Sequence, residues 1–318
     1  MRIFSIPMLI AILAIVSSGN LSQTGFAADL VIADNDEHTL NAGKYEYGTV
    51  KLGRNAKLKL NGSVTILCQK LESVEGATVE YVPNISRAAQ AKKIVIMPLD
   101  ASGTKYLKIV GNGAKGADKT GQAANGDNGR NGSWQHTSSP GRDGSQGENG
   151  GNGEHAADVL LYLQNFHPSG SVEIVTKGGD GGNGQKGGNG GSGGGGDTYR
   201  SASRGGHGGN GGNGGNAGSI TVHLVANADM TLGSLENAKA RIKSTPIIGT
   251  GGTGGSRGSG GNGGSPRGQI GGPRGARGND GQEGTGGAKG KPADALTTVT
   301  IDSTYKSIYE REKEGAKK

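Results

Sequence analysis

The stretch GGNGGSGGGGDTYRSASRGGHGGNGGNGG, residues 187–215, is glycine-rich on both sides of a single interruption, DTYRSASR. Its glycines follow a period of three. Seven glycines share one phase across residues 178–196, and seven of the eight glycines in residues 272–290 do the same. Three residues per turn is the period of the extended, left-handed polyproline II type of helix. The spacing therefore predicts ordered, extended segments, because a flexible linker has no need of a fixed phase.

Glycine at every third position leaves one face of such a helix without side chains, and doublets such as GGNGGN leave two faces bare. Bare faces allow neighbouring backbones to pair their N–H and C=O groups. A collagen triple helix is one alternative, but it needs an unbroken Gly-X-Y frame and usually much proline. Disorder is another, since ordering a residue's backbone costs about 1–2 kcal/mol and glycine buries little apolar surface. The sequence favours a side-by-side bundle of polyglycine II helices.

The glycines are concentrated in three excursions, 111–156, 178–218 and 249–290, which hold 55 of the 66 glycines. Each excursion is entered and left through a strand-like stretch, such as SVEIV before the second excursion and SITVHLV after it. Each is also broken once near its middle, by SWQHTSSP, DTYRSASR or SPRGQI. These breaks predict two legs per excursion, and they predict that all three breaks lie together at the far end. The six legs are 111–132, 141–156, 178–196, 205–218, 249–264 and 271–290.

The segment before the first excursion alternates apolar and polar residues between glycine turns, which is typical of strands. NAKLKL, beginning at Asn55, recurs loosely as GATVEY, beginning at Gly76, a spacing of 21 residues. That spacing suits a β-solenoid, with a β-sandwich as the competing interpretation. The predicted fold class is thus mostly β plus polyglycine II. It consists of an N-terminal β-solenoid or sandwich region at 28–110, then a β-core with three two-legged excursions forming a six-leg helix bundle, at 111–301.

The two ends of the chain differ in composition from the glycine-rich and strand-like segments. Residues 1–27 combine a basic start at Arg2, a short apolar run and small residues before Ala28, which predicts a secretory signal peptide. We therefore expect export to the extracellular space or the outer cell surface. Residues 302–318 place Tyr305, Ile308 and Tyr309 at helical spacing among many charges. A docking helix and a frayed charged tail both fit this pattern, and the tail is favoured.

Composition restricts the partners and the chemistry. The net charge of +7 favours anionic partners, such as acidic glycans or lipopolysaccharide, and its scatter argues against nucleic acid. Cys68 is the single cysteine and alternates with Val64 and Ile66, so it is expected in the core. The six histidines have no metal-ligand spacing, and no nucleophile–base constellation stands out. We expect no enzymatic activity, no cofactor and no metal.

The paired glycine-rich legs joined by short loops resemble the polyglycine II sandwich of bacteriophage tail-fibre adhesins and, more distantly, the bundles of snow-flea antifreeze proteins. The resemblance covers residues 111–290. It implies that the loops at the bundle tip contact a receptor. By position, that role would fall to six residues: Trp134, His136, Tyr199, Arg200, Arg204 and Arg267. The chain departs from both families, because it begins with a signal peptide and scatters Lys and Arg along the legs.

Three functions follow as expectations. The first is a secreted or cell-surface structural or adhesive protein, whose legs present aromatic and Arg side chains to glycan or envelope. An equally good interpretation is that those six residues only form ordinary turns and bind nothing. The second is an ice-binding protein, in which the repeat itself is the active surface. The third is an extracellular matrix or filament subunit that associates through exposed β edges.

Overall fold

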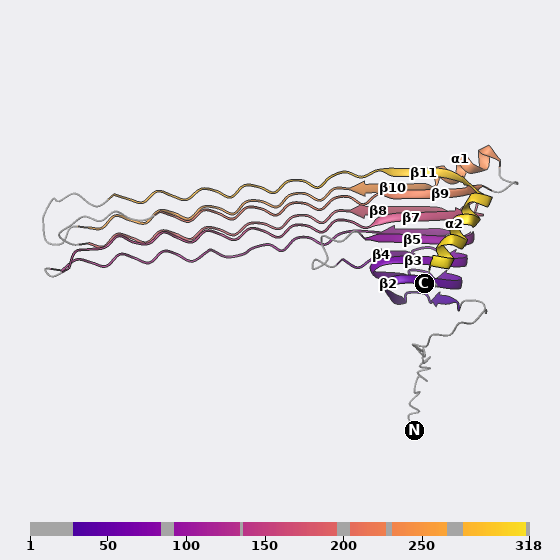
Figure 1. Cartoon of the computed structure of the whole chain (residues 1–318), viewed down its shortest axis with the longest axis horizontal. Helices are drawn as coiled ribbons and strands as arrows, with labels where there is room; N and C mark the ends of the chain where they lie inside the picture. The colour runs from indigo at the N-terminus through magenta and orange to yellow at the C-terminus, as the bar shows by residue number, and fades with distance from the viewer. Residues whose placement is uncertain are drawn as a thin grey trace, which may run out of the picture.

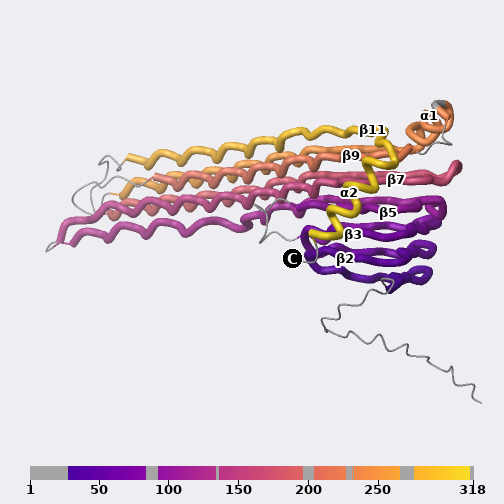
Figure 2. Tube along the Cα trace, turned by 45° about the vertical axis from the view of Figure 1, so that its right-hand side comes forward, coloured from indigo at the N-terminus to yellow at the C-terminus, as the bar shows by residue number. Residues whose placement is uncertain are grey.

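The computed structural model describes residues 28–83, 92–133, 136–195, 204–226, 231–265 and 276–315. The predicted signal peptide lies outside these residues. The described chain forms a block of strands at one end, from which the glycine-rich segments run out side by side in one direction (Figures 1 and 2). The strand block thus forms the base of an elongated molecule, and the glycine-rich segments form its longer part.

The described residues contain eleven strands and two helices. The strands are β1 (Leu30–Ile32), β2 (Glu37–Leu52), β3 (Lys57–Ser73), β4 (Thr78–Tyr81), β5 (Lys93–Thr104), β6 (Tyr106–Val110), β7 (Asp158–Gln164), β8 (Ser171–Lys177), β9 (Ile220–Ala226), β10 (Ile242–Ile247) and β11 (Ala295–Ile301), and the helices are α1 (Leu232–Ala240) and α2 (Asp302–Gly315).

All eleven strands belong to one sheet, and the recorded strand pairs are parallel. The long strand β3 is its pivot, because its first residues pair with β4 and its later residues pair with β5. One arm continues through β4, β6, β8 and β10, and the other through β5, β7, β9 and β11. The terminal strands β10 and β11 contact one another, so the sheet is nearly closed and barrel-like.

Alternating side chains from the two arms meet in one apolar core. Ile109 and Ile174 come from one arm, Ile96 and Leu161 from the other, and all four are buried. Cys68 lies in the same cluster, as its alternation with Val64 and Ile66 predicted, and burial raises the pKa of its thiol to about 12. The core accounts for the strand-like stretches around each glycine excursion, since every one of them supplies a strand to this sheet.

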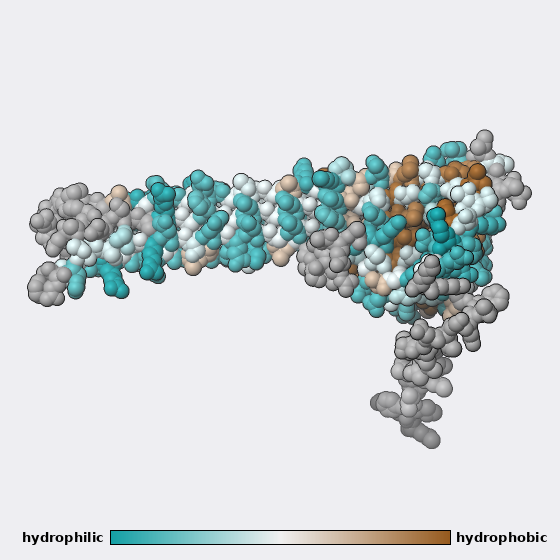
Figure 3. Space-filling view, in the orientation of Figure 1, coloured by the Kyte–Doolittle hydropathy of each residue, from teal (hydrophilic) through white to brown (hydrophobic). Residues whose placement is uncertain are grey.

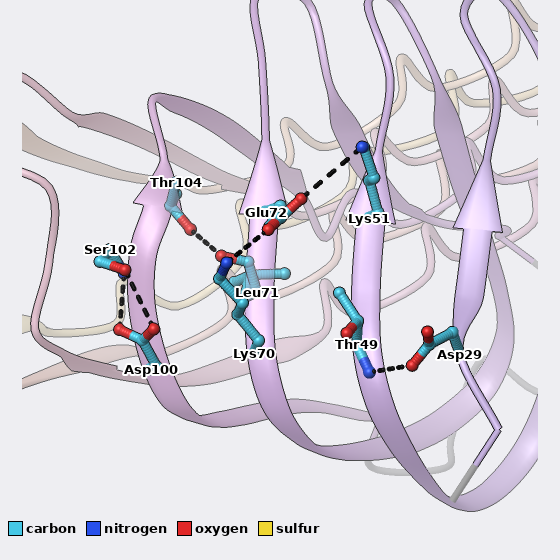
Figure 4. Close-up of polar contacts among 9 residues, drawn as sticks. All are labelled: Asp29, Thr49, Lys51, Lys70, Leu71, Glu72, Asp100, Ser102 and Thr104. Carbon is cyan, nitrogen blue, oxygen red and sulfur yellow. Dashed lines mark hydrogen bonds and ion pairs between the residues drawn. The ribbon is translucent and has the colours of Figure 1, made fainter.

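Polar contacts join successive strands on the outside of the N-terminal part (Figure 4). The backbone N–H of Thr49 donates to the Asp29 carboxylate at 2.7 Å, and Glu72 of β3 forms an ion pair with Lys51 of β2 at 3.8 Å. The predicted spacing of 21 residues appears here as a pairing register, with Lys57 opposite Thr78 and continuing to the end of β4. The repeat in the sequence is therefore a repeat of neighbouring parallel strands.

The predicted fold class is wrong. Neither an N-terminal β-solenoid or sandwich followed by a separate β-core, nor a six-leg polyglycine II helix bundle, describes this fold. The chain forms a largely parallel, nearly closed sheet with two short helices, and the glycine-rich segments adopt no regular helix or strand. The physical reason lies in the strand pairing, because β6 to β11 extend the same two arms that β4 and β5 begin.

The favoured interpretation of the C-terminal segment as a charged tail is also corrected, because residues 302–315 form helix α2. Tyr305 and Tyr309 are buried on one side of it, and the Tyr305 ring stacks on Tyr162 of β7 with centroids 4.9 Å apart. The Tyr305 hydroxyl donates to the Pro98 carbonyl at 2.7 Å. Apolar contact therefore outweighs the charge of this segment and holds the helix on the sheet. Within the described residues, neither helix is long and apolar enough to cross a bilayer.

Candidate functional site

The glycine-rich legs are joined to one another by backbone hydrogen bonds. We number them in chain order as leg 1 (111–132), leg 2 (141–156), leg 3 (178–195), leg 4 (205–218), leg 5 (249–264) and leg 6 (276–290). Each leg of the first four donates N–H groups to the leg two further along, as Gly116 of leg 1 does to the Asp180 carbonyl of leg 3 at 2.8 Å. Legs 1, 3 and 5 therefore form one layer, and legs 2, 4 and 6 form another.

A second set of hydrogen bonds joins the two layers. The Gly182 N–H of leg 3 donates to the Gly151 carbonyl of leg 2 at 2.8 Å, and the Gly212 N–H of leg 4 donates to the Gly182 carbonyl at 2.7 Å. This pattern repeats every three residues along the legs. The predicted pairing of backbones between neighbouring legs is confirmed, although the predicted fold class is not.

The close approach of these backbones explains the glycines. A Cβ atom added to Gly212 would lie 1.9 Å from the Gly151 carbonyl oxygen, and one added to Gly252 would lie 2.0 Å from the Gly182 oxygen. The inner legs 3 and 4 meet neighbours on more sides than the outer leg 6, and they carry glycine doublets where leg 6 mostly carries single glycines. The number of glycine phases in a leg therefore follows the number of neighbouring backbones.

The remaining position of each triplet carries a side chain that points out of the layer. Figure 3 shows these polar side chains as bands across the glycine-rich part of the molecule. On legs 2, 4 and 6 and the residues that border them, they form a surface that we call the even face. Its members are Asp143, Gln146, Asn149, Asn152, His155, Arg204, His207, Asn210, Asn213, Asn216, Asn279, Gln282, Thr285, Ala288 and Lys291.

Side chains of the even face are hydrogen-bonded to the backbone of the next leg. The Asn149 Oδ1 accepts from the Asn210 N–H at 2.8 Å, and the Asn210 Oδ1 accepts in turn from the Thr285 N–H at 3.0 Å. Asn152 and Asn213 repeat this arrangement three residues further along. The asparagines thus satisfy the N–H groups that the backbone pairing leaves over.

Two histidines take the place of asparagine on this face. The Nδ1 atom of His155 accepts from the Asn216 N–H at 2.9 Å, and Nδ1 of His207 accepts from the Gln282 N–H at 2.8 Å. In a neutral ring, an acceptor at Nδ1 places the proton on Nε2. Both rings are exposed and therefore turn an N–H donor towards the solvent.

The opposite surface, formed by legs 1, 3 and 5, carries a different set of groups. We call it the odd face; its residues are Asn112, Lys115, Asp118, Asn125, Asn128 and Asn131, then Asp180, Asn183, Lys186, Asn189 and Ser192, then Thr250, Thr253, Ser256, Ser259 and Asn262. The backbone hydrogen bond from Thr250, aided by Lys177, holds the pKa of Asp180 at about 2. The Lys115 ammonium, with the Asn183 N–H, lowers the pKa of Asp118. Acidic groups therefore lie within the odd face.

Two of the six predicted tip residues are described. His136 is exposed and exchanges backbone hydrogen bonds with Ser133, at 2.8 and 3.1 Å. The Arg204 N–H donates to the Asp143 carboxylate at 2.7 Å, which places Arg204 on the even face beside leg 2. The other four, Trp134, Tyr199, Arg200 and Arg267, lie outside the described residues.

The described ends of the three excursions lie close together. The Gly132 N–H at the end of leg 1 donates to the Gly195 carbonyl at 2.7 Å. A Cβ added to Gly195 would lie 2.6 Å from the carbonyl oxygen of Ser265, which follows leg 5. Gly132, Gly195 and Ser265, one residue from each excursion, therefore lie close together at the far end of the legs, where the three breaks begin.

The sequence reasoning missed the two polar faces. It assigned the candidate binding residues to the breaks and named none of the residues between the glycines as a site. The signal was nevertheless present, since asparagine, aspartate, threonine and histidine recur at the one non-glycine position of the GGX triplets. What could not be read from the sequence was which triplets lie side by side.

Comparisons with known proteins give this chain no family. No protein-family model matches, and no curated protein matches. Among solved structures, the springtail antifreeze protein of Granisotoma rainieri, described as a nine polyproline type II helical bundle, is 24% identical and covers 54% of this chain and 94% of its own. The TM-score is 0.11, so the two folds do not superpose and the likeness carries no argument.

Proposed function

We propose that this chain is an exported, non-enzymatic structural and adhesive protein of the cell surface, whose legs hold the three breaks out as binding loops. The observation that supports this is the meeting of Gly132, Gly195 and the Ser265 neighbourhood at the far end of the legs. Backbone hydrogen bonds at every third residue make the legs a stiff spacer between the sheet and these loops. A stiff spacer reduces the entropy lost when the segments that it carries bind a partner.

The test is replacement of Trp134, Tyr199 and Arg200 by alanine. We expect binding to cells or to acidic polysaccharide to be lost while the circular dichroism spectrum is unchanged. The matched control replaces two exposed lysines at the sheet end, Lys243 and Lys289, by alanine, and binding should then persist. Unaltered binding in the loop variant would disprove the adhesive role of the breaks.

Ice binding is a second candidate, favoured by the regular ranks of polar side chains on two opposite faces. In that case the legs, and not the breaks, carry the activity. Thermal hysteresis of the purified protein decides it, because the loop variant should then keep full activity. A protein without thermal hysteresis is not an ice-binding protein.

A filament or matrix subunit is a third candidate, favoured by exposed apolar side chains on the terminal strand β11. Val299 is 54% exposed and Ile301 is 69% exposed. An edge strand with such side chains is suited to pairing with another chain. Concentration-dependent fibres that disappear in a Val299→Lys variant would support this role, and a monomer at all concentrations would exclude it.

A further inference from the structure

The even face is a surface of hydrogen-bond donors. Each of its paired asparagines accepts a backbone N–H, so the acceptor must be Oδ1 and the amide orientation is fixed by its partner. The Nδ2 group then points elsewhere and carries two donors. Asn149, Asn152, Asn210 and Asn213 are exposed and so present these donors to the solvent.

The histidines add to the same set of donors. His155 and His207 accept at Nδ1 and, as neutral rings, turn Nε2–H outwards. Each therefore presents one donor where an asparagine presents two. The acceptor atom of each paired residue already takes part in a hydrogen bond with the next leg, whereas its N–H donors point away from that bond.

The charges of the even face match its donors. Of its fifteen positions only Asp143 is acidic, and one of its oxygens already accepts from the Arg204 N–H. Arg204 and Lys291 are cationic and exposed. Glu148, at the edge of leg 2, forms an ion pair with Lys119 of leg 1 at 2.7 Å. The odd face differs in charge, because two carboxylates, those of Asp118 and Asp180, lie in it where the even face has one.

We propose that the even face binds an extended acidic polysaccharide along its length. Carboxylate and sulfate oxygens only accept hydrogen bonds, and they accept most strongly from a surface with a positive charge. This inference rests on the proposed adhesive role, and it makes the even face a second binding surface besides the loops. It names the partner by its chemistry, a polymer with regularly repeated anionic groups.

The geometry suits a polymer better than a small ligand. The side chains that are hydrogen-bonded across legs 2, 4 and 6 form rows, such as Asn149, Asn210 and Thr285. Successive rows, or ranks, are three residues apart along each leg, which in an extended chain is up to roughly 10 Å. A repeating chain can therefore meet several ranks at once, and many weak contacts on one rigid surface add up to useful avidity. The fixed backbone pairing means that these donors need little ordering on binding.

The experiment measures binding of the whole mature chain, residues 28–318, to polygalacturonate, with neutral dextran as the comparison polymer. The test variant carries Asn149→Asp, Asn210→Asp and Asn213→Asp. Aspartate keeps an Oδ1 acceptor for the backbone, as Asp143 and Asp180 do in the native chain, but it removes the donors and adds negative charge. The matched control places the same three changes on the odd face, at Asn125, Asn183 and Asn189.

We expect the even-face variant to bind polygalacturonate at least about tenfold more weakly than the native chain, and the odd-face variant to stay within about twofold. Amide hydrogen exchange across the legs checks that both variants keep the backbone pairing. Equal losses in the two variants would show an effect of net charge alone and overturn the proposal. Native binding to dextran that equals binding to polygalacturonate would also overturn it.

The same measurements separate this inference from the proposed function. If native protein does not bind polygalacturonate but the loop alanine variant still abolishes adhesion to cells, the even-face proposal fails and the adhesive role stands. If the loop variant adheres normally while the even-face variant loses polymer binding, the even face stands and the role of the breaks fails.

Discussion

The carboxylate of Glu154 lies 2.5 Å from the ammonium Nζ of Lys92, and both side chains are almost fully buried where leg 2 meets the sheet. The same carboxylate accepts hydrogen bonds from the Tyr81 hydroxyl at 3.0 Å and from the Ala114 N–H at 2.9 Å. One buried side chain thus joins β4, the start of β5 and legs 1 and 2.

The first prediction follows from that burial. Lys92→Met removes the ammonium that faces the buried Glu154 carboxylate, which we expect to lower the unfolding free energy by about 3–5 kcal/mol. Removing an exposed partner should do little, so Lys119→Met, which breaks the exposed pair with Glu148, is the matched control. Urea unfolding measures both. Similar small effects in the two variants would show that the buried pair does not hold the legs on the sheet.

The second prediction concerns the close approach of the legs. In Gly212→Ala the new Cβ would lie 1.9 Å from a backbone oxygen, so legs 2 and 4 must separate. We expect a loss of roughly 1–3 kcal/mol and faster amide exchange in both legs. In Gly286→Ala, at the outer edge, the nearest atom lies 3.6 Å away, and stability should be unchanged or slightly higher. Equal effects at the two sites would contradict the observed packing.

The third prediction tests the histidines in asparagine positions. His207→Asn should leave stability nearly unchanged, because Asn Oδ1 can accept the Gln282 N–H as Asn210 accepts that of Thr285. His207→Leu removes the acceptor and should cost up to about 1 kcal/mol. Amide exchange at Gln282 is the local measurement. It should be fast in the leucine variant and slow in the asparagine variant.

The fourth prediction is a pH dependence. The folded pKa of Asp180, about 2, lies below the unfolded value of about 3.9. Its ionised form therefore stabilises the fold above that unfolded value, and the stabilisation is lost as the pH falls towards 2. Asp180→Asn keeps the acceptor for Thr250 but cannot ionise. Native protein should be more stable than this variant at pH 5, and the two should converge near pH 2 in urea titrations. A constant difference across this range would exclude the linkage.

The fifth prediction concerns the docking of α2. Tyr305→Phe removes the buried hydrogen bond from the hydroxyl to the Pro98 carbonyl and should cost about 1 kcal/mol. Tyr309→Phe serves as the control, because the Tyr309 hydroxyl makes no hydrogen bond within the described chain. Exchange of the α2 amides should increase in the first variant only. Identical exchange in both would indicate that ring packing alone holds the helix.

Some of this arrangement could be predicted residue by residue. The alternation around Cys68 correctly placed it in the core, and the phase of Gly178, Gly181 and Gly184 correctly marked positions that face another backbone. Local pattern was sufficient in both cases, because strand alternation and glycine period are properties of a few consecutive residues. The same local pattern misjudged Tyr305 and Tyr309, whose burial depends on a sheet surface far away in the chain.

The sequence by itself therefore determined where backbone had to meet backbone, through glycine, and where strands had to face a core, through alternating apolar residues. Only the tertiary structure decided that the strands around every glycine excursion join the N-terminal strands in one parallel sheet. It also decided that Asn149, Asn210 and Thr285 stand in one rank across three legs. These pairings are 61 and 75 residues apart in the chain. No local periodicity encodes them, because they depend on how the excursions stack when their flanking strands pair.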